Sequence, residues 1–142
     1  MAQIADPTNL QKLEYDVTTA EGPSHVTIVT GLIPVNFSSG GGVGNVTGSF
    51  ETLVDPTLAP GQFRKATAIA SIAGWSSYWS AAPPPPTQAG VSIQQVEATL
   101  DDESGKIQLR IDTSAWIAGS GNAGISMIAF QVTTLSKLSQ PA

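Results

Sequence analysis

The chain has 142 residues with a formal net charge of −5, and charged residues make up 12% of it, well below the usual share of about 25%. This acidic balance excludes nucleic acids and anionic membranes as partners, because both require clustered Lys and Arg side chains. The chain contains no cysteine, which excludes disulfides, thiolate metal sites and cysteine nucleophiles. The length suits a single domain over 1–142, with an N-terminal arm at about 1–12 and a C-terminal tail at about 137–142.

The first residues predict a soluble chain that opens with a short helical turn. Residues 1–7 have neither the basic nor the apolar stretch of a classical signal peptide, so we expect a protein that is cytoplasmic or released without one. No apolar run approaches the roughly 18 residues that span a bilayer, so no membrane insertion is expected. Asp6 suits a helix cap and Pro7 suits the first helical position, with Leu10 and Leu13 three residues apart behind them.

Alternation of apolar and polar residues predicts about 7–8 short strands along the chain. The clearest case is Ile107, Leu109 and Ile111, which alternate with polar residues. The other expected strands cover residues 15–19, 25–30, 33–37, 46–53, 66–73, 91–100 and 125–135. Stretches rich in Gly, Pro and Ser separate them, at 38–44, 55–61 and 119–124. This pattern predicts an all-β fold, namely an antiparallel β-sandwich of jelly-roll or lectin-like type.

The strands on either side of residues 101–104 are expected to form a hairpin. If those four residues make the loop, Val96 lies opposite Leu109 and Ala98 lies opposite Ile107. This register places the apolar residues of both strands on one face, whereas a slip of one residue would not.

A β-bulge is expected in the first strand of this hairpin. Val91 and Ile93 have the opposite parity to Val96 and Ala98, so the apolar phase changes across Gln94-Gln95. One extra residue on one strand restores the phase, and a β-bulge supplies it.

No catalytic residue, metal ligand or cofactor is expected from the titratable residues. The single histidine, His25, follows Ser24, and neighbours on a strand point to opposite faces, so the two do not form a nucleophile and base pair. Asp101, Asp102 and Glu103 form the acidic cluster, but they fall at the expected hairpin tip, where solvation explains them. No spacing selects two carboxylates for glycoside hydrolysis, and no calcium-loop motif occurs.

The aromatic segment that ends in four prolines at 83–86 is the main candidate for recognition. Trp75, Tyr78 and Trp79 fall within five residues, and we expect the segment to leave the sheet and turn, which frees at least one ring from the core. Three roles are open: closing one end of the core, contacting another subunit, or stacking on a sugar ring. Trp116 joins these residues as a candidate ligand or subunit contact.

The order of elements in the second half of the chain is similar to that of small sandwich lectins. The strand at 66–73, the hairpin at 91–112, Trp116 and the strand at 125–135 carry this architectural likeness, which suits particle-forming or phage-tail sandwich proteins equally. With a neutral, weakly charged surface, we expect a non-enzymatic module that self-associates into a homo-oligomer and recognises a glycan. The alternative is a structural subunit of a larger phage, virion or secreted assembly, and the third is a carboxylate-based hydrolase.

Overall fold

The computed structural model describes residues 2–39, 44–79, 88–118 and 121–138. The described residues form strands and connecting loops without any helix, which confirms the all-β class. The strands are β1 (Gln3–Ile4), β2 (Thr8–Thr19), β3 (Gly22–Ser38), β4 (Gly44–Val54), β5 (Phe63–Trp79), β6 (Gln88–Leu100), β7 (Ile107–Ala118) and β8 (Gly121–Lys137).

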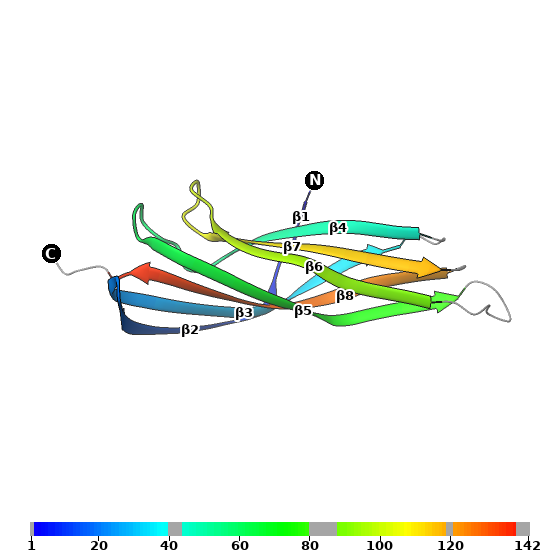
Figure 1. Ribbon diagram of the computed structural model, residues 1–142, viewed down its shortest axis with the longest axis horizontal. Coiled ribbons are helices and arrows are strands. Elements are labelled where there is room, and N and C mark those ends of the chain that lie inside the picture. The colour runs from blue at the N-terminus through cyan, green and yellow to red at the C-terminus, as the bar shows by residue number, and fades with distance from the viewer. Residues whose placement is uncertain (1, 40–43, 80–87, 119–120, 139–142) are drawn as a thin grey trace.

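The strands form two four-stranded sheets, in the orders β1-β4-β7-β6 and β2-β3-β8-β5. We call them the β4–β7 sheet and the β3–β8 sheet. Figure 1 shows β4, β7 and β6 lying as one layer over the other sheet. Strands β5 and β6 contact each other across the two layers. All described pairings are antiparallel except that of β1, which runs parallel to β4, so the β4–β7 sheet is mixed and the β3–β8 sheet is antiparallel.

The prediction of a helical turn near the N-terminus is wrong, because this segment is the strand β2. Its residues pair antiparallel with β3 from Thr8 to Thr19, with one irregularity between Thr8 and Gln11. Along this strand the apolar side chains of Leu13 and Tyr15 alternate with charged ones, and a period of two favours a strand over a helix. The expected arm at about 1–12 therefore holds β1 and the first part of β2.

The core lies between the two sheets and is built largely from β-branched side chains. On β7, the alternate residues Ile107, Leu109 and Ile111 are all fully buried. Phe50 of β4 meets Phe37 of β3 edge to face, with ring centroids 6.1 Å apart. The buried cluster consists of Val29, Ile33, Phe50, Val54, Ile107, Leu109, Ile111, Ile125, Ile128, Phe130 and Val132.

The β6–β7 hairpin keeps the predicted inward face but not the predicted register. Ala98 lies opposite Leu109, and Val96 lies opposite Ile111, so the pairing differs from the expected one by two residues. Because a shift of two preserves which side chains face inward, the hydrophobic pattern alone does not discriminate between these registers. The bulge predicted at Gln94-Gln95 is confirmed by a register shift between Ile93 and Gln95.

The hairpin loop itself explains the shift in register. The N–H of Asp101 donates to the carbonyl of Lys106 at 2.9 Å, and the N–H of Gly105 donates to the carbonyl of Asp101 at 2.8 Å. The Asp101 carboxylate also accepts a hydrogen bond from the Ser104 N–H at 3.1 Å. Gly105 adopts a φ of 75°, which glycine reaches without steric cost. These bonds close the loop around residues 102–105, one residue later than expected, and this moves the pairing of the two strands by two residues.

Candidate functional site

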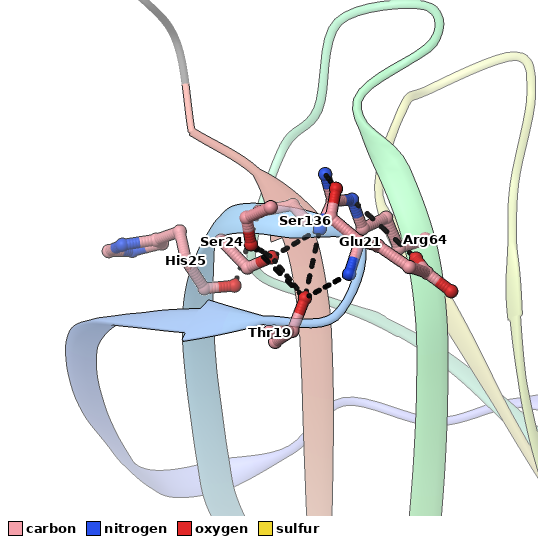
Figure 2. Close-up of polar contacts among 7 residues, drawn as sticks. Thr19, Glu21, Ser24, His25, Arg64 and Ser136 are labelled. Atoms are coloured by element: carbon pink, nitrogen blue, oxygen red, sulfur yellow. Dashed lines mark hydrogen bonds and ion pairs between the residues drawn. The ribbon is translucent and has the colours of Figure 1, made fainter.

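A largely buried arginine, Arg64, stabilises one end of the β3–β8 sheet. Arg64, at the start of β5, donates hydrogen bonds to the Ser24 hydroxyl, to the Thr19 hydroxyl at 3.4 Å and to the Glu21 carbonyl oxygen at 3.0 Å (Figure 2). The Arg64 side chain is 11% exposed, and Ser24 is fully buried. These bonds satisfy polar groups that lie out of water, so the cluster stabilises the β2–β3 turn.

Figure 2 shows that His25 points away from this cluster. Two carboxylates of β2 lie beside its ring. Its Nδ1 lies 2.7 Å from Asp16 Oδ1, and its Nε2 lies 3.3 Å from Glu14 Oε1. The hydrogen bond to Asp16, with that to Glu14, raises the pKa of His25 against a smaller opposing effect of burial. A catalytic serine needs one histidine nitrogen free to accept its proton, and here both nitrogens face carboxylates. The geometry is that of a cross-strand ion pair.

The outer face of the β4–β7 sheet is polar, and we call it the polar face. The fully buried residues Ile107, Leu109 and Ile111 of β7 point inward, so the residues that alternate with this set along the strand point outward from the sheet, although Ser114 among them is also buried. With their cross-strand neighbours, these outward residues are Asn45, Thr47, Ser49, Glu51, Leu53, Gly90, Ser92, Gln95, Glu97, Thr99, Gln108, Arg110, Asp112, Ser114 and Trp116.

Trp116 supplies the aromatic surface of the polar face. It lies opposite Gly90 of β6 and opposite Asn45 of β4, and it is 37% exposed. A Cβ atom at Gly90 would fall 2.5 Å from the indole Nε1 and 2.8 Å from Cε2, so the ring lies across the space that a side chain there would need. Gly90 therefore lets the indole lie against the sheet with part of the ring open to solvent.

The polar groups around Trp116 are held in place by hydrogen bonds to each other. The hydroxyls of Ser92 and Ser114 are 2.7 Å apart on neighbouring strands. Farther along β7, Asp112 accepts a hydrogen bond from Ser49 at 2.6 Å and one from Arg110 at 3.2 Å. The Ser49 bond, and then the Arg110 guanidinium, lower the pKa of the Asp112 carboxyl. An aromatic ring beside ordered donors and acceptors suits a ligand with an apolar face and several hydroxyls.

The aromatic segment Trp75–Trp79 does not leave the sheet, so that prediction is wrong. It forms the last part of β5 and pairs with residues 121–125 of β8, because that strand continues far enough to complete the ladder. Trp75 is 54% exposed and lies in a different sheet from Trp116, so the two tryptophans do not share a sheet face. The side chains of Tyr78 and Trp79 and the prolines at 83–86 lie outside the described residues.

The outer face of the β3–β8 sheet carries exposed apolar side chains among polar ones, and we call it the apolar face. Its most exposed members are Ile69 at 65%, Leu13 at 60% and Tyr15 at 48%. Cross-strand pairing places Leu13 opposite Ile28 and Tyr15 opposite Val26, which lies opposite Leu135, whereas Ile69 lies opposite Gln131. These side chains leave apolar area in contact with water on this face.

The sequence predicted Trp116 as a candidate contact but did not predict its neighbours on the polar face. Asn45, Gly90 and Ser92 come from two other strands, and only the pairing of β4 and β6 with β7 brings them beside the ring. The one available signal was the outward parity of Ser114 and Trp116 relative to the apolar residues of the same strand.

Comparison with known protein families, with curated proteins and with solved structures finds no match for the chain. Within the described residues, no group of three or more His, Cys, Asp and Glu side chains is arranged to hold a metal ion. Over the same part of the chain, the structure has no helix with the length and hydropathy that crossing a membrane requires. The site is therefore interpreted from its own geometry.

Proposed function

We propose that the protein is a non-enzymatic, self-associating recognition module with a lectin-like β-sandwich fold, and that it binds a carbohydrate on its polar face. The position of Trp116 carries this proposal. Its indole lies across Gly90 with 37% of the residue exposed, and the exposed Ser92 on the neighbouring strand β6 carries a hydroxyl that is hydrogen-bonded to the buried Ser114 of β7.

The chemistry of a sugar fits this arrangement in two ways. The C–H face of a pyranose ring stacks on an indole, and its hydroxyls exchange hydrogen bonds with side chains such as Ser, Asn and Asp. The exposed Ser92 lies two residues from Gly90 along β6, roughly 7 Å away, which is within the span of one sugar ring and its hydroxyls, whereas its partner Ser114 is buried. Asp112 and Ser49, one step farther along, would contact a second ring.

Mutation of Trp116 tests the proposal directly. A glycan array identifies the sugar, and titration followed by tryptophan fluorescence gives its affinity. We expect Trp116→Ala to weaken binding by about 2 kcal/mol, roughly thirtyfold, as the loss of a buried aromatic contact does. Trp116→Phe should retain part of the affinity, and the melting temperature should change little. The bound sugar should be recovered intact after incubation, as a non-enzymatic module requires.

Trp75→Ala is the matched control, because Trp75 is also exposed but lies in the other sheet. It should leave sugar affinity unchanged. If Trp75→Ala removes binding and Trp116→Ala does not, the site belongs on β5. If no glycan binds the wild-type protein, the carbohydrate proposal is wrong.

The second candidate is a structural subunit of a larger particle or appendage, and the apolar face favours it. Ile69 and Leu13 are each at least 60% exposed there, and charged residues make up only 12% of the chain. Such a surface becomes stable in water when neighbouring copies cover it. Sedimentation of the protein at several concentrations tests this candidate: defined assemblies without any glycan binding would favour it over the first.

A further inference from the structure

Strand β2 ends the β3–β8 sheet and leaves one edge without a partner among the described strands. At the opposite side of the molecule, β5 and β6 contact each other across the layers. Regular pairing of β2 with β3 begins at Gln11, after an irregularity at which Asn9 has a φ of 52°. Unprotected edge strands present free N–H and C=O groups to other strands.

We propose that a second copy of this chain pairs antiparallel with this edge, with a two-fold axis at Leu13. The inference rests on the self-association proposed above and specifies the surface that produces it. The two copies would continue the β3–β8 sheet from one subunit into the next, with the partner's β2 beside β2.

Symmetry and charge together select this register. Opposite residues on antiparallel strands point to the same face of the sheet. A two-fold axis perpendicular to the sheet must therefore lie midway between one residue and the same residue of the other copy. Lys12 on the axis would place two lysines together, and Glu14 would place two glutamates together. Tyr15 on the axis would set Glu14 against Asp16. Leu13 on the axis sets Lys12 against Glu14 of the other copy, twice, and joins two apolar side chains.

The side chains in this register are accessible in the single chain. Lys12 Nζ lies 3.5 Å from Asp55, and Glu14 Oε1 lies 3.3 Å from His25, yet the side chains of Lys12 and Glu14 remain 45% and 43% exposed. Leu13 is 60% exposed on the other face of the strand. Pairing would therefore add contacts to both faces of β2 without breaking its bonds to β3.

The same symmetry gives the dimer a functional consequence. Because the axis is perpendicular to the sheets, the polar faces of both copies point to the same side. Two Trp116 platforms facing one way would bind a glycan-rich surface with higher avidity than either one alone.

Reversal of single charges tests the register. Wild-type protein should sediment at twice the chain mass of 14.6 kDa at micromolar concentration. Lys12→Glu sets glutamates against each other and Glu14→Lys sets lysines against each other, so each variant should dimerise at least about tenfold more weakly. An equimolar mixture of the two variants restores both opposite-charge pairs and should dimerise like the wild type. Thermal unfolding of each variant confirms that the single chain is folded.

Cross-linking provides an independent measurement, because the chain has no cysteine of its own. Leu13→Cys should form a covalent dimer with a short bismaleimide. Val17→Cys, on the same strand and the same face, is the matched control, because the two copies of residue 17 would lie roughly 27 Å apart. It should remain uncoupled.

The outcomes separate this inference from the broader proposal. A wild-type protein that stays monomeric at all concentrations overturns both self-association and the β2 pairing. A dimer that neither charge reversal weakens, that the mixture does not restore, or that couples through residue 17 overturns the β2 pairing alone and assigns self-association to another surface, such as the apolar face.

Discussion

The two outer faces of this molecule follow the same strand alternation and have opposite chemistry. On the polar face, Arg110 and Asp112 form an ion pair at 3.2 Å, and hydroxyls bond to each other. On the apolar face, Tyr15 and Ile69 are exposed, opposite Val26 and Gln131 respectively. The fold requires only that the inward face of each sheet be apolar. The outward residues are therefore free to reflect function. In the proposed function, the polar face contacts a sugar and the apolar face contacts protein.

The largest effect on stability is expected when a carboxylate is introduced on the inner face of β7 and compared with one on its outer face. Leu109 is fully buried and Gln108 points outward from the same strand. We expect Leu109→Asp to lower the free energy of unfolding by about 4 kcal/mol or more, because it removes core packing and buries a carboxylate. Gln108→Asp should change it by less than about 0.5 kcal/mol. Urea unfolding measures both, and equal losses would mean that the face assignment is wrong.

A smaller change at Gly90 sharpens the role of the polar face. The Cβ atom of Gly90→Ala would lie 2.5 Å from the Trp116 Nε1, so the indole must move off the strand. We expect sugar affinity to fall about tenfold or more, with little change in melting temperature, since the displaced ring is already partly exposed. Glu97→Ala, farther along the same face of β6, should leave affinity unchanged. If Gly90→Ala binds the sugar with full affinity, the position of the Trp116 ring over residue 90 does not matter for binding.

On the apolar face, Ile69→Ser tests whether the two faces act independently. Ile69 is 65% exposed, so its replacement should change the free energy of unfolding by no more than about 0.5 kcal/mol. Sugar affinity should be unchanged. The dimer formed by β2 should persist, while any larger assembly that covers this face should dissociate in sedimentation. Loss of sugar binding in this variant would contradict the division between the faces.

The smallest expected effect concerns His25, which lies on neither outer face. Because Asp16 and Glu14 raise its pKa above 6.5, the ion pair stabilises the fold below about pH 6.5 and loses its effect as pH rises through the folded-state pKa. His25→Gln should therefore lower the free energy of unfolding by about 0.2–1 kcal/mol near pH 5.5 and by nothing near pH 9. Sugar binding at neutral pH should be unaffected, and a large loss there would place His25 in the site.

Patterns of period two predicted the strands well where one face is buried. The bulge at Gln94-Gln95 followed from a change of apolar parity, and the inward face of β7 followed from Leu109 and its neighbours. Each inference uses only adjacent residues and the alternation of side chains along a strand. The prediction from helical spacing was wrong at Leu10 and Leu13. These residues are three apart, which suggested a helix, but the segment pairs with β3 as a strand.

Predictions that needed a partner strand were weaker. The aromatic segment 75–79 was expected to turn, but residues 121–125 of β8 extend beside it and keep it in the sheet. The β6–β7 register was wrong by two residues, since the loop bonds of Asp101 and the φ of Gly105 decide among registers that share a face.

The sequence by itself determined the all-β class, the inward faces of the main strands and the exclusion of cysteine chemistry, because composition and alternation are local properties of the chain. Only the tertiary structure decided that Gly90 makes room for Trp116, that Ser92 meets Ser114, and that β2 lies at a sheet edge. Those features depend on which strands become neighbours. Neighbours are chosen by the packing of the whole core, which no short stretch of sequence encodes alone.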